Sequence, residues 1–335
     1  MPRIVRLHQL GGPENLRVEN IAFEAPGSGE VLLRVEAAGI NRDQFAFMAG
    51  EHYSSHGIVQ PKLPSRIGYE VAGVVQAVGE GVDRSWIGKR VATYPGFDQN
   101  RYGTLGEEAI VPNGVFTEAP SQLTAAEAAT FWMPYLTAYG ALVSVASIKR
   151  GDFVSITAGS SSVALAAIQF VRDAGATAIA VSRTSAKKEE LLALGAHHVI
   201  SASEEDYVSR VREITKGGGV RITLDPLAGP FLEQLAAAAA PGGIIVEYGR
   251  LSGQPTPFPL LSVIGRGLTI RGFVMSQVMA IGQTRIEAQR HIVDLLADGR
   301  FVPKVAKTFP LDQTIEAYQF LESTQQIGRV VITMR

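Results

Sequence analysis

Short apolar segments alternate with longer amphipathic ones between residues 152 and 249, and this alternation is the feature that most constrains the fold. Segments such as DFVSITA and VRITLD have the length and composition of buried strands, whereas SVALAAIQFVRDA has helical periodicity. Parallel strands need crossover connections, which are usually helices. The sequence therefore predicts an α/β domain with a doubly wound parallel sheet and helices on both faces.

The turn between the first strand-like segment and the first helical segment reads AGSSSVA, residues 158–164. A dinucleotide-binding turn of the Rossmann type needs small residues at three positions, which here are Ala158, Ser161 and Ala164. The N–H groups and the positive dipole end of the following helix bind phosphate without any side chain. An ordinary serine-capped connection is the alternative, but the further strand–helix alternations favour a dinucleotide site.

The second strand-like segment ends in Ser182, Arg183 and Thr184, with Lys187 three residues further on. A domain that binds NAD usually has an acidic residue here for the ribose 2′-hydroxyl, whereas one that binds NADP has arginine and small polar residues. No acid stands at this position, and an arginine with a lysine suits a 2′-phosphate. A solvated helix start is the alternative, although cations at that end oppose the helix dipole. We therefore expect NADPH as the cofactor.

The beginning of the chain has a different pattern. Short strands such as EVLLRVEAAGI, broken by glycine and proline, predict a β-rich, barrel-like domain. We assign residues 1–126 to this domain and residues 127–270 to the Rossmann domain. Residues 271–335 contain two helical segments and a closing strand, and we expect them to return to the first domain.

Composition limits the classes of protein and of partner. A length of 335 residues, with 46% hydrophobic and 19% charged residues, is typical of a soluble globular protein with two domains. A net charge of -1 without a basic run gives no indication of a nucleic-acid or anionic-membrane partner. No secretory signal opens the chain, and no apolar run approaches the roughly 20 residues of a membrane span. The absence of cysteine excludes disulfides and thiolate ligands and makes a cytoplasmic location the default expectation.

Six stretches, in this order along the chain, resemble the medium-chain dehydrogenase/reductases, and specifically their zinc-free quinone oxidoreductase branch. They are AAGINRDQ, LPSRIGYEVAGVVQAVGEGV, WMPYLTAYGAL, AGSSSVALAAIQ, SRTSAKK with LLALGA, and LTIRGFV. The resemblance covers essentially the whole chain. It implies a GroES-like, β-rich catalytic domain combined with a Rossmann domain that binds NADPH.

The resemblance also bears on metal binding. Zinc-dependent relatives have a cysteine where this chain has Asn41 and a histidine where it has Tyr69, so that only Glu70 of that set is retained. A catalytic zinc takes three protein ligands and an open position, and we expect no metal here. Alcohol oxidation would then lack the Lewis acid that stabilises an alkoxide. Hydride addition to a quinone or an activated C=C bond needs it less, because conjugation spreads the charge and a hydrogen bond suffices.

The resemblance implies which residues line the site. Asn41 and Tyr69 are the candidates to hydrogen-bond the substrate oxygen, and Tyr53 is a further candidate for the substrate side. The residues expected to contact the cofactor are Arg42, Thr137, Ser161, Ser162, Val163, Ala164, Ser182, Arg183, Lys187, Tyr248, Gly249, Arg250, Leu251, Phe273, Val274 and Arg329.

These expectations describe an NADPH-dependent reductase of quinones or α,β-unsaturated carbonyl compounds, acting on a small electrophilic substrate. Two alternatives remain open: a carbonyl reductase or alcohol dehydrogenase that works without zinc, and a protein that binds NADPH without catalysis, since a fold does not determine a function. The apolar segment LTIRGFV, residues 268–274, is expected at the edge of the Rossmann sheet. Pairing of this edge with its own copy predicts a homodimer.

Overall fold

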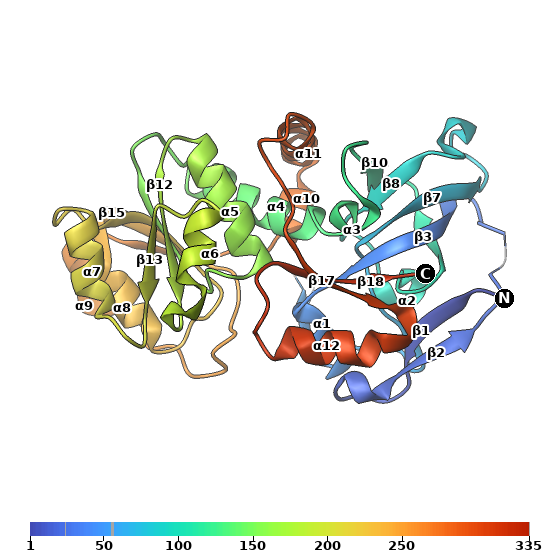
Figure 1. The fold of residues 1–335 in the computed structure, drawn as a ribbon, viewed down its shortest axis with the longest axis horizontal. Coiled ribbons are helices and arrows are strands. Elements are labelled where there is room, and N and C mark those ends of the chain that lie inside the picture. The colour runs from blue at the N-terminus through green and yellow to red at the C-terminus, as the bar shows by residue number, and fades with distance from the viewer. Residues whose placement is uncertain (24, 55–56, 335) are drawn as a thin grey trace. The chain divides into compact units, whose positions relative to one another are not determined.

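The computed structural model describes residues 1–23, 25–54 and 57–334, and the chain forms two compact units (Figure 1). The first unit consists of Met1–Met133 and Val293–Arg335, and the second of Pro134–Ile292. Among the residues described, no helix is long and apolar enough to cross a membrane.

The second unit is built on one sheet with the strand order β13-β12-β11-β14-β15-β16, in which all neighbours are parallel. Its strands are β11 (Phe153–Ile156), β12 (Thr177–Ser182), β13 (His198–Ser201), β14 (Val220–Asp225), β15 (Ala239–Glu247) and β16 (Thr269–Gly272). This confirms the predicted doubly wound α/β fold. The strand order reverses between β11 and β14, and open α/β sheets bind their ligands outside the carboxyl ends of the strands at such a point.

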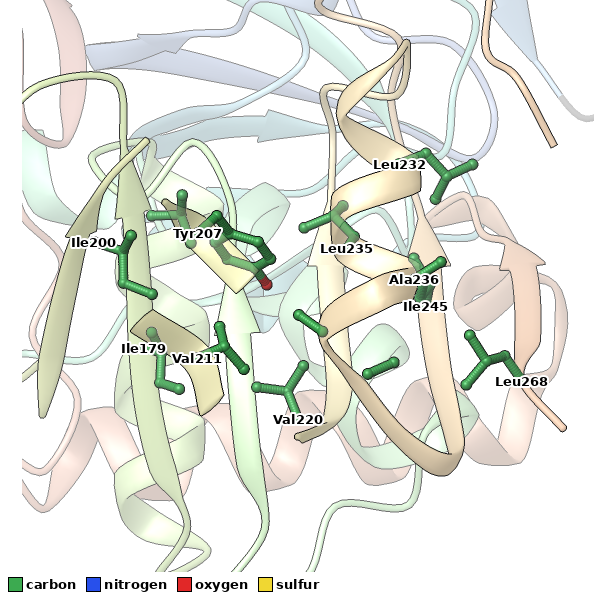
Figure 2. Close-up of a cluster of buried hydrophobic side chains, with 13 residues drawn as sticks. Ile179, Ile200, Tyr207, Val211, Val220, Leu232, Leu235, Ala236, Ile245 and Leu268 are labelled. Carbon is green, nitrogen blue, oxygen red and sulfur yellow. The ribbon is translucent and has the colours of Figure 1, made fainter. Parts of the chain in front are cut away.

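Helices lie between these strands along the chain, and further helices precede the first strand or follow the last. They are α4 (Trp132–Tyr139), α5 (Ser162–Asp173), α6 (Lys188–Ala193), α7 (Tyr207–Ile214), α8 (Phe231–Ala238), α9 (Leu260–Arg266), α10 (Ser276–Ala280) and α11 (Gly282–Ala297), with a π-helical turn (Gly140–Val145) after α4 and a 3-10 turn (Ser185–Lys187) before α6. Helices α7 and α8 contact each other and bury Tyr207, Val211 and Leu235 against the strands (Figure 2). The hydroxyl of Tyr207 lies 2.8 Å from the Ser155 hydroxyl, so burial of the phenol leaves no polar atom unpaired.

Residues 271–292 lie in the second unit, whereas the sequence assignment placed them with the segment that returns to the first. The N–H of Phe273 donates to the carbonyl of Glu247 at 2.8 Å, which extends the pairing of β16 with β15. A Cβ at Gly140 would lie 2.3 Å from the Phe273 ring, so the glycine lets this ring pack closely. These contacts join distant parts of the chain, and helix or strand periodicity does not reveal them.

The first unit is rich in antiparallel strands. Its larger sheet has the order β10-β8-β7-β3-β18-β17, with β9 also paired to β3, and its smaller sheet has the order β2-β1-β6. The strands are β1 (Arg3–Leu7), β2 (Leu16–Asn20), β3 (Glu30–Ile40), β4 (His52–Ser54), β5 (Gly57–Val59), β6 (Ser65–Arg66), β7 (Val71–Val78), β8 (Arg90–Thr93), β9 (Glu108–Pro112), β10 (Phe116–Glu118), β17 (Val305–Pro310) and β18 (Arg329–Thr333). Short helices lie between them: α1 (Asp43–Met48), α2 (Gln99–Tyr102), α3 (Ala125–Ala128) and α12 (Thr314–Glu322), with 3-10 turns at Pro13–Asn15, Arg84–Trp86 and Leu311–Gln313.

The end of the chain completes the larger sheet of the first unit. Strand β18 pairs antiparallel with β3 and parallel with β17, so it lies between an early strand and a late one. All residues of β18 except Thr333 are buried. The closing strand is therefore part of the core of the first unit.

The turn from β11 to α5 contains local backbone strain. Ala158 has φ +48°, a left-handed conformation that costs a residue with a Cβ about 1–2 kcal/mol. Gly159 follows it, and its N–H donates to the carbonyl of Val181 at 2.9 Å, so the turn passes close to β12. The strain therefore lies in the first of the three small residues predicted for the dinucleotide-binding turn.

We expect Ala158→Gly to stabilise the protein, because glycine adopts positive φ without strain. The gain should be at most about 1 kcal/mol, since glycine also loses more backbone entropy on folding than alanine does. The measurement is the free energy of unfolding by denaturant titration. The matched control is Ala174→Gly at the end of the same helix, where φ is -70° and the substitution should destabilise. Equal destabilisation by both changes would show that the turn is not strained.

Candidate functional site

The turn after β11 presents the N-terminus of α5. Ser161 is the N-cap residue, and its hydroxyl accepts a hydrogen bond from the N–H of Ala164 at 3.2 Å. The first backbone bond into the helix runs from the Leu165 N–H to the Ser161 carbonyl, so the N–H groups of Ser162 and Val163 precede it. Two N–H groups and the positive end of a twelve-residue helix dipole are thus available for an anion.

Two cations lie beside this turn. The ammonium of Lys187 donates to the hydroxyl of Ser160 at 3.1 Å. Burial lowers the pKa of Lys187, and the charge of Arg183 lowers it further, because the two cations are close. The carbonyl of Arg183 accepts two hydrogen bonds from Ser203, which hold its backbone in place. Paired cations at the end of β12 fit a phosphate dianion better than a ribose hydroxyl.

Ser182 does not point a free hydroxyl at this site. It is the last residue of β12, and its hydroxyl donates to the carbonyl of Thr184 at 2.7 Å. The bond shapes the bend that leads to Lys187. Its effect on a cofactor would therefore come through the position of that bend.

Two acids stand at the carboxyl ends of β14 and β15. Asp225 is fully buried and accepts hydrogen bonds from the hydroxyl of Thr157 and from the N–H groups of Leu227 and Ala228. Its register neighbour Glu247 is buried at its carboxyl oxygens, and no donor among the described residues reaches either of them. Sequence analysis did not single out either acid, because a single acid at the end of a strand carries no motif.

The residues that follow β15 make the next part of this edge. Burial raises the pKa of Tyr248 and the nearby Ser161 opposes that shift, so the phenol adjoins the phosphate turn, while its hydroxyl oxygen is buried with no hydrogen-bond partner among the described residues. Gly249 passes close to the carbonyl of Pro226, where a Cβ would come within 2.7 Å. Arg250 and Leu251 are exposed. Close backbone approaches and polar side chains therefore line the carboxyl edge of the sheet.

Three further residues of the second unit were expected at the cofactor. Thr137 lies in α4 and is 5% exposed. Phe273 is buried and its N–H is used by β15, while Val274 is 36% exposed. The carbonyl of Val274 accepts a hydrogen bond from the N–H of Gln277 at 3.0 Å, and the role of all three residues stays a prediction.

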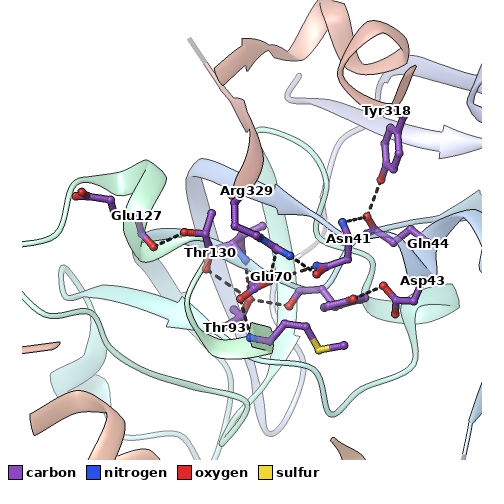
Figure 3. Close-up of polar contacts among 12 residues, drawn as sticks. Asn41, Asp43, Gln44, Glu70, Thr93, Glu127, Thr130, Tyr318 and Arg329 are labelled. Atoms are coloured by element: carbon purple, nitrogen blue, oxygen red, sulfur yellow. Dashed lines mark hydrogen bonds and ion pairs between the residues drawn. The ribbon is translucent and has the colours of Figure 1, made fainter. Parts of the chain in front are cut away.

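A buried polar cluster joins three strand ends in the first unit (Figure 3). Glu70 precedes β7, Arg329 begins β18 and Asn41 follows β3, and each is 5% exposed or less. The guanidinium of Arg329 donates to the carboxylate of Glu70 and to the amide oxygen of Asn41. Glu70 also accepts from the amide of Asn41 at 3.3 Å and from the N–H of Met133 at 2.8 Å. The Asn41 side chain is therefore held by two charged partners.

The position of Arg329 depends on a glycine of the neighbouring strand. A Cβ at Gly39 would lie 2.7 Å from a guanidinium nitrogen of Arg329 and 2.3 Å from the carbonyl of Ala129. Burial raises the pKa of Glu70, and the positive charge of Arg329 opposes the shift. The pair is thus a structural ion pair in this unit, and a contact from Arg329 to a cofactor stays a prediction.

Tyr69 precedes Glu70 and is 4% exposed. Its hydroxyl donates to a carboxylate oxygen of Asp43 at 2.6 Å, and its carbonyl accepts from the hydroxyl of Thr93 at 2.9 Å. Burial and then the charge of Asp43 raise its pKa well above the usual value, so the phenol stays neutral. Asp43 was not among the expected site residues, and the signal for it was an acid two residues after Asn41.

Two further candidates belong to the first unit. Arg42 contacts the end of a helix, and the side chain of Tyr53 is not described. The guanidinium of Arg42 donates to the carbonyls of Leu321 and Glu322, at the end of α12. The backbone of Tyr53 belongs to β4, but its side chain lies outside the described part of the structure. Their proposed contacts with cofactor and substrate remain untested predictions.

A metal site needs several His, Cys, Asp or Glu side chains close together. Within residues 1–23, 25–54 and 57–334, no three or more His, Cys, Asp or Glu side chains are grouped so that they could hold a metal ion. The chain also has no cysteine.

Comparison with known proteins gives matches along the whole chain. Residues 27–122 match the family model for the alcohol dehydrogenase GroES-like domain, and residues 162–293 match that for zinc-binding dehydrogenase. The 2-haloacrylate reductase of Burkholderia sp is 31% identical over 332 residues, which is 97% of either chain. The quinone oxidoreductase of Homo sapiens is 27% identical over 342 residues, 99% of this chain and 98% of that one.

Solved structures agree with the sequence matches. The Escherichia coli quinone oxidoreductase complexed with NADPH has a TM-score of 0.88 to this chain at 27% identity, with 99% of each chain covered. Because both units match in chain order and a relative of 31% identity aligns over nearly the full length, this chain belongs to the medium-chain dehydrogenase/reductase superfamily, in the quinone oxidoreductase branch of that family of oxidoreductases.

Proposed function

We propose that the protein is an NADPH-dependent, zinc-free reductase that transfers hydride to quinones or α,β-unsaturated carbonyl compounds. The observation that carries the proposal is the pair of cations at the end of β12, where the Lys187 ammonium contacts Ser160 of the phosphate turn beside Arg183. A relative named as a 2-haloacrylate reductase and a quinone oxidoreductase structure with NADPH support it.

The second unit would hold the cofactor, which supplies the hydride when bound. The N–H groups of Ser162 and Val163 would bind the pyrophosphate at the start of α5. Arg183 and Lys187 would bind the 2′-phosphate through charge-assisted hydrogen bonds. Gly249 keeps the chain after β15 close to Pro226, where a larger residue would push it outward.

The first unit would supply the hydrogen bond to the substrate oxygen. That oxygen gains negative charge as hydride reaches the electrophilic carbon, and a donor aimed at it lowers the barrier. Tyr69 is the candidate donor, because its phenol is neutral, while both ends of the Asn41 amide are held by Arg329 and Glu70. The hydroxyl of Tyr69 donates to Asp43 in this structure, so donation to substrate requires the hydroxyl hydrogen to turn away from Asp43.

A screen of acceptors tests the proposal as a whole. NADPH oxidation is measured with quinones, with enones and with simple ketones in turn. Activity confined to simple ketones would replace the proposal by a zinc-independent carbonyl reductase. Tight NADPH binding without oxidation by any acceptor class would indicate a cofactor-binding protein without catalysis.

The choice of cofactor is tested with Arg183→Ala. Losing one charge-assisted phosphate contact costs about 1.5–3 kcal/mol, so the Kd for NADPH should rise about ten- to a hundredfold while that for NADH changes little. Fluorescence titration of both nucleotides measures this. Arg212→Ala, an exposed arginine of α7 in the same unit, is the matched control and should leave both constants unchanged. Equal weakening of both nucleotides by Arg183→Ala would contradict the assignment.

The role of Tyr69 is tested with Tyr69→Phe, which keeps the ring and removes the hydroxyl. If the hydroxyl stabilises the developing charge, turnover on the best acceptor should fall roughly 10²-fold, while NADPH affinity stays close to the parent. Tyr102→Phe is the matched control, because its hydroxyl also donates to a carboxylate, that of Glu30, at 2.8 Å. Unchanged turnover with a lowered melting temperature would mean that Tyr69 only packs beside Glu70.

We also propose that the protein is a homodimer formed along the edge strand β16. The strand order ends at β16, so one side of it is unpaired in the sheet. Helix α9 directly precedes it and exposes Leu260, Leu261 and Ile264 to 53%, 86% and 70%. An open strand edge beside exposed apolar residues favours pairing with a second copy through a closed two-fold interface.

Light scattering at micromolar concentration should therefore give the mass of a dimer. The double change Leu261→Lys and Ile264→Lys should shift the protein toward monomer, because it places charges in the apolar contact. An exposed control, Glu233→Lys in α8, should leave the mass unchanged. A parent protein that is already monomeric would refute this interface.

A further inference from the structure

The two acids at the carboxyl edge of the second unit form a pair. Asp225 ends β14 and Glu247 ends β15, and the two are direct partners in the parallel register. Neighbouring strands are about 4.8 Å apart, so their carboxyl groups can meet. On the other side of β15 the register partner of Glu247 is Gly272, which has no side chain.

The two acids have unequal surroundings. Asp225 accepts hydrogen bonds from the Thr157 hydroxyl and from two backbone N–H groups, those of Leu227 and Ala228. No donor in the described part of the chain reaches the carboxyl oxygens of Glu247, which are buried. The hydrogen bond open to Glu247 is therefore one made with its own proton, donated to Asp225.

The electrostatic surroundings agree with this geometry. Burial raises the pKa of Glu247 to about 8, and the negative charge of Asp225 and a hydrogen bond to it add to that shift. The titratable groups that face Glu247 are Asp225 on β14 and Tyr248 next to it on the chain. Tyr248 stays neutral, since burial and both acids raise its pKa.

The pair lies at the edge that the proposed function assigns to the cofactor. Tyr248 follows Glu247 directly, and its phenol lies near enough to Ser161 of the phosphate turn for Ser161 to oppose the rise of its pKa. A nicotinamide ring is neutral in NADPH and carries a positive charge in NADP⁺. Two ionised carboxylates at this edge would therefore attract the oxidised form more strongly than a pair that shares one proton, because the shared proton cancels one of the two negative charges.

We propose that Glu247 and Asp225 share one proton in the resting protein, and that binding of NADP⁺ favours its release whereas binding of NADPH favours its retention. This inference rests on the proposed binding of NADPH. Since linkage is reciprocal, a rise in pH then strengthens binding of the oxidised cofactor relative to the reduced one. The pair would thus favour the replacement of bound NADP⁺ by NADPH, and it would do so more strongly at low pH than at high pH.

The test measures the Kd of NADP⁺ and the Kd of NADPH, each from about pH 6 to about pH 9. We expect the affinity for NADP⁺ relative to that for NADPH to rise by about five- to a hundredfold over this range, because the binding of one ligand typically changes the affinity for a second by a factor of this size. The 2′-phosphate, with a second pKa of about 6, and Lys187 titrate equally in both complexes, so they cancel in the ratio. Calorimetry in two buffers of different ionisation enthalpy counts the protons released.

Glu247→Gln should flatten the ratio of the two constants and abolish the difference in proton release between them, because the amide fills the same space without a proton to lose. Glu233→Gln, an exposed glutamate of α8, is the matched control and should behave as the parent does. A ratio independent of pH in the parent, or an unchanged pH dependence in Glu247→Gln, would overturn the inference. Failure of either nucleotide to bind would overturn the proposed function and this inference with it, whereas binding without turnover would leave the inference standing.

A second measurement needs no ligand. A glutamate with a raised pKa keeps its proton in the folded state while the unfolded state loses one above its ordinary value of about 4.3. The free energy of unfolding should therefore decline as pH rises from there to about 8. Glu247→Gln should raise the melting temperature more at the upper end of this window than at the lower end, and an equal shift at both ends would show that Glu247 holds no proton.

Discussion

The first unit depends on one ion pair that is removed from water. Arg329 and Glu70 are 5% and 1% exposed, and losing one partner of such a buried pair typically costs about 3–5 kcal/mol. Asn41 hydrogen-bonds both, so the cluster ties together the ends of three neighbouring strands, β7, β3 and β18. The same cluster holds the backbone of Glu70, and therefore also that of its neighbour Tyr69, in place. A donor for a substrate oxygen is useful only when its position is rigid, and a buried hydrogen-bond network supplies rigidity.

The second unit also buries charged side chains, at the carboxyl edge of its sheet. Asp225 is fully buried and accepts hydrogen bonds from one hydroxyl and two N–H groups, whereas no donor among the residues that the structure describes reaches the carboxyl oxygens of Glu247 beside it. Parallel strands bring the side chains at their ends into register, so an acid on each of two neighbours creates an interaction that neither has alone. Perturbed ionisation at such an edge is typical of functional sites. The phenol of Tyr248 lies between this acid pair and the phosphate turn, since the charges of both acids and the neighbouring Ser161 all influence its pKa.

Sequence reasoning recovered much of the second unit and less of the first. The small residues at 158, 161 and 164 and the basic pair Arg183 and Lys187 were visible because local spacing defines a helix N-terminus and a strand end. The structure adds that Lys187 contacts Ser160, a contact across 27 residues that no local pattern contains. Resemblance pointed to Asn41, Tyr69 and Arg329, but their hydrogen bonds to one another and to Asp43 depend on strands far apart in the chain.

The sequence alone determined the alternation of strands and helices, the glycine and serine chemistry of the turn after β11, and the lack of any cysteine ligand. These are local properties, set by backbone preference and by side-chain type, and they hold wherever the segment lies in space. Tertiary structure alone decided that Glu247 meets Asp225, that Tyr69 points to Asp43, and that residues 271–292 remain with the second unit. The physical reason is that strand register and close packing bring together residues whose separation along the chain carries no information about their distance. The charge and the proton of each buried group then follow from those neighbours, because burial makes every ionised side chain depend on its partners.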